Sequence, residues 1–127
     1  MPSNKKPGVK TTSKDFSIFK AECQRLVPIL GLTGWTIYWQ HVPVKGCFAD
    51  AQCDALEKIA TIRFSKDWFS HEGFHALDKQ NVQAVAKHEM AHVLMSDLLS
   101  LATARYVQKD EVDEAEHRIV RVLEKLL

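Results

Sequence analysis

The sequence predicts a single α+β domain: one helix, then about three mostly antiparallel strands, then two long helices. Three observations predict this fold class. Apolar residues recur at helical spacing between Asp15 and Leu30, three short segments between residues 35 and 65 alternate apolar with polar side chains, and residues 79 to 127 contain no glycine and no proline. A chain of 127 residues is long enough for one modest hydrophobic core.

The composition argues against several classes of protein. The chain is 46% hydrophobic and 26% charged, which is ordinary for a soluble globular protein, and a net charge of +1 gives no reason to expect nucleic acid as a partner. No apolar run is long enough to span a membrane. Three cysteines without a C-x-x-C spacing indicate reduced thiols, mostly small core residues, in a cytoplasmic protein.

The first segment, "MPSNKKPGVKTTSK", is polar and basic and contains two prolines. It has nothing apolar with which to dock, so residues 1–14 are expected to form a flexible tail and residues 15–127 the domain. The segment also lacks the apolar stretch of a secretory signal.

The first helix is predicted from Asp15 to Leu30, with Ser13 or Asp15 as its cap and Gly31 as its end. Its apolar residues are Phe16, Phe19, Cys23, Leu26, Val27 and Leu30.

Strands are predicted for "WTIYWQHV", "FADAQCD" and "KIATIRFS", and "DALE" can form a hairpin turn between the second and the third. The side chains expected on the core face are Trp35, Ile37 and Trp39 in the first segment and Ala60, Ile62 and Phe64 in the third.

The C-terminal segment cannot be one helix. A helix from Lys79 to Leu127 would be about 70 Å long, whereas a compact domain of this size has a radius of gyration of about 14 Å. We expect the chain to fold back between Ser100 and Asp110, with Asp110 as the cap of the last helix.

Two segments fit H-E-x-x-H, the pattern in which a helix presents two zinc-binding histidines and a glutamate base. "HEMAH" contains His88, Glu89 and His92 and lies in a helix-forming stretch that is apolar nearly all round. Ionisable groups in a buried helix are costly unless they are paired or bind metal. Either histidine alone could be a satisfied core residue, but the three together predict two metal ligands and a catalytic base.

The other match, "HEGFH", contains His71, Glu72 and His75. Gly73 at its centre weakens a helix by about 1 kcal/mol relative to alanine. The segment also follows a predicted strand after only "KDWF". These residues are therefore expected in a loop, in solvent or at the edge of a cleft.

A catalytic zinc ion takes three protein ligands and keeps one position open. Six residues after His92 the sequence has Leu98, which cannot bind zinc. Asp97 lies about 180° around the helix from His88 and is expected to point away. The third ligand is therefore expected outside this helix.

The last helix offers Glu116, which falls in a stripe with Val112, Ile119, Leu123 and Leu126. An inward carboxylate needs a partner, and a zinc ion held by two histidines is one. We predict that Glu116 faces inward as the third ligand. A pair with lysine or arginine is the alternative role of Glu116, and Asp113 and Glu111 are the substitute ligands.

These motifs together resemble the gluzincin metallopeptidases in their most reduced form, the minigluzincins, and particularly small metallopeptidase-like proteins of phages and prophages. The matching segments are "GW" before the first strand, "ATIRFSKDW" as edge strand and exit, "HEMAHVLM" as zinc helix and "DEAEHRIVRVLEKL" as glutamate helix. The resemblance covers roughly residues 16 to 127. Larger gluzincins carry an aspartate four residues after the ligand glutamate, where this chain has Val120.

The resemblance implies a minimal zincin-like domain that hydrolyses peptides with Zn²⁺. His88, His92 and Glu116 would hold the metal, Glu89 would activate the zinc-bound water, and a peptide or protein substrate would lie along the strand "ATIRF". Residue type alone offers three side chains to stabilise the oxyanion, Tyr106, His75 and His117.

The expected location is the cytoplasm, that of the host cell if a phage encodes the protein, or the virion. No nucleic acid or membrane partner is expected. The alternative is a zinc-containing phage module that binds a partner with little or no catalysis. A protease that acts on a regulatory or DNA-bound protein is a third interpretation, and salt-dependent DNA binding would distinguish it.

Overall fold

The computed structural model of the chain describes residues 9–68, 76–104, 106 and 108–126. The predicted α+β class is confirmed, and the helices and strands follow the predicted order with two short strands added. The elements are β1 (Val9–Lys10), α1 (Ser13–Ile29), β2 (Thr36–Val42), β3 (Ala49–Asp54), β4 (Ile59–Ser65), β5 (Asp67–Trp68), α2 (Lys79–Thr103) and α3 (Lys109–Leu126).

Strands β2, β4 and β3, in that order, form a mixed sheet. β3 and β4 pair antiparallel through a turn at residues 55–58, as the "DALE" turn predicted. β2 and β4 pair parallel, so the prediction of a mostly antiparallel sheet is wrong for one of the two pairings. The reason is the order of the strands in space: β3 takes the far edge, and β4 returns between β3 and β2.

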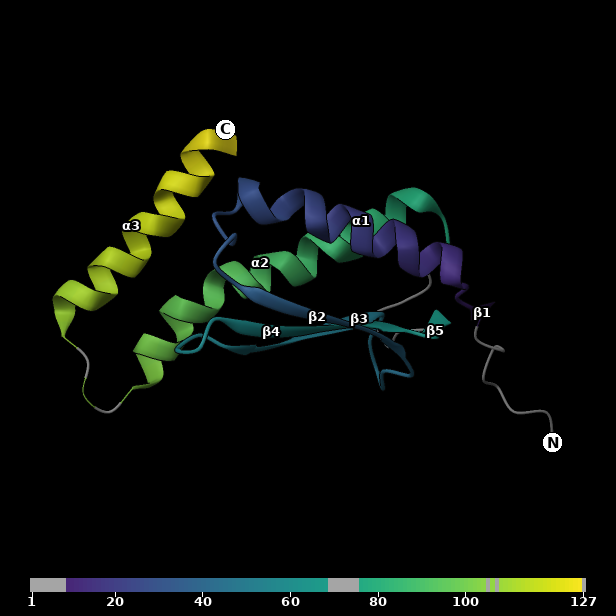
Figure 1. The fold of residues 1–127 in the computed structure, drawn as a ribbon, viewed down its shortest axis with the longest axis horizontal. Coiled ribbons are helices and arrows are strands. Elements are labelled where there is room, and N and C mark those ends of the chain that lie inside the picture. Colours follow the sequence, from purple (N-terminus) through teal and green to yellow (C-terminus); the bar gives the residue numbers. More distant parts are fainter. Residues whose placement is uncertain (1–8, 69–75, 105, 107, 127) are drawn as a thin grey trace.

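Helices α1 and α2 lie side by side along one face of the sheet (Figure 1). The predicted core residues of β4 are all fully buried on that face, and those of β2 are half-buried. The opposite face is open, and Tyr38 on it is 56% exposed. Cys23 lies in the core as predicted, whereas Cys47 is partly exposed and Cys53 exposed.

The first helix begins with a capping box. The Thr12 hydroxyl accepts a hydrogen bond from the Asp15 amide (3.2 Å), and the Asp15 carboxylate accepts one from the Thr12 amide (2.8 Å). Thr12 is therefore the cap, not Ser13 or Asp15, although Asp15 completes the box. Gly31 ends the helix as predicted, because its φ of 72° is left-handed and favours glycine.

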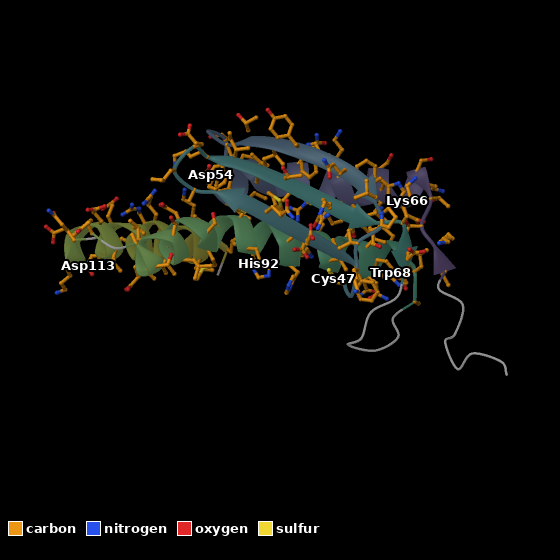
Figure 2. The ribbon with its side chains drawn as sticks, turned by 90° about the horizontal axis from the view of Figure 1, so that it is seen from below. Cys47, Asp54, Lys66, Trp68, His92 and Asp113 are labelled. Carbon is orange, nitrogen blue, oxygen red and sulfur yellow. The ribbon has the colours of Figure 1, made fainter. Side chains whose placement is uncertain are left out.

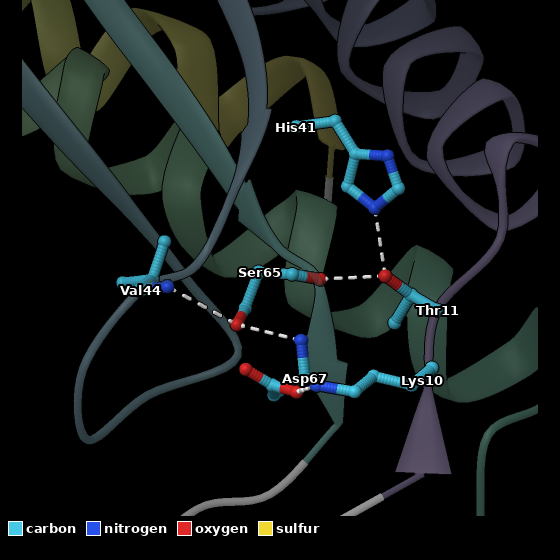
Figure 3. Close-up of polar contacts among 6 residues, drawn as sticks. All are labelled: Lys10, Thr11, His41, Val44, Ser65 and Asp67. Atoms are coloured by element: carbon cyan, nitrogen blue, oxygen red, sulfur yellow. Dashed lines mark hydrogen bonds and ion pairs between the residues drawn. The ribbon is translucent and has the colours of Figure 1, made fainter.

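The predicted flexible tail is too long, because residues 9–14 belong to the fold. β1 pairs antiparallel with β5, and Thr11 is only 8% exposed. The Thr11 hydroxyl donates to the Ser65 carbonyl oxygen (2.7 Å) and lies 2.7 Å from His41 Nε2 (Figure 3). Its single proton points to Ser65, so His41 Nε2–H donates to Thr11.

Ser65 connects three segments at this point. Its fully buried hydroxyl accepts hydrogen bonds from the amides of Val44 (3.3 Å) and Asp67 (3.1 Å) (Figure 3). Lys10 and Asp67 add an ion pair across β1 and β5. The N-terminal segment is thus fastened to the ends of β2 and β4.

Helix α2 begins after Asp78, whose carboxylate accepts a hydrogen bond from the Asn81 amide (2.8 Å). It ends at Thr103, and α3 starts at Lys109, so the chain folds back within the predicted region. Asp110 is not the cap of α3 but lies in its first turn. In the described part of the chain, no helix combines the length and the apolar character that a membrane span requires.

Replacing Thr11 by valine is expected to lower the free energy of unfolding by about 1–3 kcal/mol, because the His41 N–H and the Ser65 carbonyl lose a buried partner. Urea denaturation measures the change. Thr33→Val is the control, since Thr33 is exposed. Equal stability of Thr11→Val and the parent protein would show that these bonds contribute nothing.

Candidate functional site

Helix α2 places His88 and His92 on the same side, one turn apart. Their Nε2 atoms are 3.1 Å apart, and the rings meet edge to face with centroids 4.7 Å apart. Two imidazole nitrogens that bind one tetrahedral zinc ion at about 2.0–2.1 Å are about 3.3–3.4 Å apart. The two exposed side chains therefore converge as ligands of one metal ion do.

Glu89 points in a different direction from the histidines. It lies about 100° further around α2 than His88, turned toward the sheet, and is only 5% exposed. Burial raises the pKa of its carboxyl to about 7, and the negative charge of Asp50 adds to the rise. A carboxyl with a pKa near neutral pH can both accept and donate a proton there.

Asp50 is a residue of the site that sequence reasoning did not single out. It lies on β3 opposite Arg63 of β4, and its carboxylate forms an ion pair with that guanidinium through two hydrogen bonds. Both side chains are partly buried, at 27% and 29% exposure. The ion pair holds the negatively charged Asp50 carboxylate near Glu89, whose pKa it raises. Only the register of β3 on β4 reveals it, and no motif in the sequence encodes that register.

A cavity of about 490 Å³ opens between α2 and the β3 edge of the sheet, within the size range of small-ligand sites. The Phe48 and Trp68 rings at its wall are stacked, with centroids 4.3 Å apart. Figure 2 shows His92 along the same rim of the molecule as Cys47 and Trp68. The lining residues are Asn81, Ala84, Val85, His88, Glu89 and His92 from α2, and Cys47, Phe48, Ala49, Asp50, Ala51 and Trp68 from the sheet side.

The strand beside the cavity is β3, not the predicted "ATIRF". That segment is β4, which is central and pairs on both sides, so its backbone has no free edge for a substrate. β3 pairs only with β4 in the three-stranded sheet. The prediction failed because an alternating pattern identifies a strand but not its place in the sheet.

The zinc-motif helix is also less buried than its apolar sequence predicted. Val82, Ala86, Met90 and Val93 are fully buried, but the side that carries the histidines is exposed. Met95 and Leu99 continue that side and are 43% and 66% exposed. The protein is too small to cover α2 on every side.

Glu116 does not face inward. Its side chain is exposed, and the buried residues of α3 are Ala115 and Val122. Glu116 lies about 100° around α3 from Ala115 and therefore on the flank of the buried stripe. The predicted stripe was turned too far around the helix, since its members Leu123 and Leu126 are 47% and 53% exposed.

Helix α3 packs on the side of α2 that faces away from the histidines. Arg118 of α3 forms an ion pair with Asp97 (2.5 Å), which lies about 180° around α2 from His88. The structure thus brings the three residues of the motif together but not Glu116. Within residues 9–68, 76–104, 106 and 108–126, no group of three or more His, Cys, Asp or Glu side chains could hold a metal ion.

The other candidates do not approach the cavity either. The substitute ligands Glu111 and Asp113 lie on α3, and Figure 2 shows Asp113 at the opposite end of the molecule from Trp68. Tyr106 is 86% exposed in the connection between α2 and α3. His117 is exposed on α3, with Nδ1 2.8 Å from the Asp113 carbonyl oxygen.

The second motif, with His71, Glu72 and His75, lies outside the described residues. His75 was also a candidate for stabilising the oxyanion.

Comparison with known proteins adds no relative. The chain matches no protein-family model, no curated protein and no solved structure.

Glu89→Gln is expected to stabilise the metal-free protein at neutral pH. The carboxyl pKa rises from its ordinary 4.5 to about 7 on folding, so between these values the folded protein binds more protons than the unfolded chain. The free energy of unfolding therefore falls as the pH rises from 4.5 to 7, by about 3 kcal/mol at most. Glutamine does not titrate, and the variant escapes this loss.

Urea denaturation in the presence of a chelator at pH 4 and pH 8 measures the effect. The exposed Glu57→Gln is the matched control. If the stability difference between Glu89→Gln and the parent were the same at both pH values, the Glu89 carboxyl would not titrate in this range.

Proposed function

We propose that the protein is a zinc-dependent metallopeptidase with a reduced, gluzincin-like zincin fold. One observation carries the proposal: two imidazole nitrogens converge at 3.1 Å beside a buried glutamate, in a cavity bounded by the edge of a sheet. A structural zinc site would need four protein ligands and no cavity. Two exposed histidines beside an open cavity fit a metal that must also contact a substrate.

His88 and His92 would hold the zinc ion through their Nε2 atoms. A zinc ion bound there supplies Lewis acidity, which polarises a scissile carbonyl and lowers the pKa of a coordinated water toward about 7. The histidines must be neutral to bind metal, so zinc affinity would fall at acidic pH.

Glu89 would move the proton. Its carboxylate accepts the proton of the attacking water and passes it to the leaving amine. Beside a cation the carboxyl would be ionised at neutral pH, because an opposite charge favours the charged form. Its burial between α2 and β3 holds it in place, so that little orientation is lost when the substrate binds.

The substrate would lie extended beside β3 and extend the sheet through backbone hydrogen bonds. Ala49 and Ala51 of β3 line the cavity with methyl groups only, which leaves room for a second chain. This replaces β4 by β3 as the substrate-binding strand.

Glu116 stays the proposed third ligand, although α3 packs on the other side of α2. For Glu116 to bind a metal held by the two histidines, α3 would have to move around α2 to the side that carries them. The exposed apolar residues Met95 and Leu99 on the histidine side, and Leu123 on α3, leave apolar surface that such a movement could cover.

A metal-binding module without catalysis is the second candidate function. The observation that favours it is that, among the described residues, the structure brings two metal-binding side chains together at the motif and no third. Zinc bound tightly by a chain that cleaves no peptide, with Glu89→Gln unchanged in affinity for its partner, would support this candidate.

Glu89→Gln is expected to keep its zinc while peptide cleavage falls by at least about 100-fold, because the proton acceptor is lost but the ligands are not. His92→Ala is expected to lose both. Zinc content is measured by elemental analysis after dialysis, and turnover on a peptide library by mass spectrometry. Glu57→Gln, which removes an exposed carboxylate in the turn between β3 and β4, should change neither quantity. Unchanged turnover in Glu89→Gln would exclude the assigned role.

Glu116→Gln tests the third ligand separately. If Glu116 binds the metal, zinc affinity should fall by more than the about 10–100-fold that outer-shell substitutions cost. Titration against a competing chelator measures the affinity. Glu124→Gln, an exposed glutamate of the same helix, is the control. Equal zinc affinity of the two variants would show that the third ligand lies elsewhere.

A further inference from the structure

We propose that a second cavity, enclosed by α2, α3 and the connection between α1 and β2, binds a small amphiphilic carboxylate, an acid with one apolar chain. The cavity has a volume of about 530 Å³, which lies in the size range of small-ligand sites. Asp97 lines it and lies about 180° around α2 from His88. The cavity is therefore separate from the candidate metal site. The inference does not depend on zinc binding or catalysis, but it requires α3 to stay in its observed place on α2.

Apolar side chains from three segments line the interior of this cavity. Leu32 before β2, Val93 of α2 and Val122 of α3 are at most 9% exposed, and the half-buried Trp35 adds an aromatic wall. Trp35, Leu94 and Ile119 are half-buried and leave apolar surface in the cavity, which an alkyl chain placed there would remove from water. The lining therefore selects a ligand with an apolar body.

The rim of the cavity is basic. Four basic and two acidic side chains line it, and Glu114, outside the lining, pairs with Arg121. Lys58 and Lys125 then stand against Glu124, which leaves an excess of one positive charge. Arg118 and Arg121 are already paired with Asp97 and Glu114, respectively. The two remaining cations are Lys58 and Lys125, and neither forms an ion pair within the described part of the chain. A carboxylate at the rim would supply the anion that these lysines lack.

Lys58 is held at the rim by the backbone. Its φ of 55° is left-handed, a conformation that L-residues rarely adopt, and its carbonyl accepts a hydrogen bond from the Thr36 amide (2.9 Å). Its Nζ lies 5.9 Å from the centroid of the Trp35 ring. A positive charge thus lies next to the apolar wall of the cavity. An acid with an apolar chain carries its negative charge next to its apolar part in the same way.

Ligand binding would also stabilise α3. Helix α3 lines much of this cavity, yet only Ala115 and Val122 of the helix are buried. A ligand between α3 and the rest of the domain would add apolar contacts to both. Amide exchange in α3 should therefore slow when the site is filled.

The test is an NMR titration of the ¹⁵N-labelled full chain with decanoate, below its micelle concentration. The amide signals of Gly31 and Leu32 and the indole signal of Trp35 are expected to shift saturably. Those of Asn81 and Val85, in the first cavity, should stay unchanged. Decanol and decyltrimethylammonium have the same chain without the negative charge and should bind at least about tenfold more weakly.

The charge-removing variants make the result specific. The double variant Lys58→Gln/Lys125→Gln is expected to weaken decanoate binding at least about tenfold, whereas Lys45→Gln, an exposed lysine away from the cavity, should leave it unchanged. Equal affinity for decanol, equal affinity of the double variant, or shifts at Asn81 and Val85 instead would each overturn the proposal. So would the absence of any saturable shift.

Discussion

The packing of α2 against the β3 edge of the sheet is the constraint on which the candidate site depends. β3 presents Ala49 and Ala51 to the cavity, and these short side chains leave space between the strand and α2. Contact on this side buries Glu89, while His88 and His92, about 100° and 60° back around the helix, stay in solvent. One helix therefore divides into a half that builds the core and a half that can bind a ligand.

This arrangement has a cost in stability. A carboxyl that is 5% exposed and close to Asp50 is costly to ionise, which its pKa of about 7 reflects. Nothing in the folding of the domain requires an acid at this position, since an apolar residue would pack against β3 without that cost. Groups that lower stability in an open cavity are typical of functional sites.

The two sides of α2 have different neighbours. On one side the histidines and Glu89 face the cavity beside β3. On the other, Asp97 and its partner Arg118 attach α3, and a second cavity with a basic rim lies between the helices. Helix α3 buries only Ala115 and Val122, fewer residues than α1 or α2. Its position on α2 sets the distance between Glu116 and the histidines.

The sequence by itself determined the three helices, the strands of the three-stranded sheet and the convergence of the two motif histidines. Helical spacing, strand alternation, Gly31 and the absence of glycine and proline after residue 79 are local signals, and each predicted its element to within a few residues. The H-E-x-x-H spacing likewise required only a continuous helix to bring His88 and His92 together.

Only the tertiary structure decided which strand lies at the edge, which residue accompanies Glu89 and which side of α3 is buried. Alternation within a strand does not determine its neighbours. The edge strand is therefore β3 and not the predicted β4, and Asp50 was not foreseen. The stripe of α3 is equally ambiguous, because apolar residues cover more of that helix than its partners bury, and a rotation of about 100° separates an inward Glu116 from an exposed one. Long-range packing resolves such choices, and no local pattern contains it.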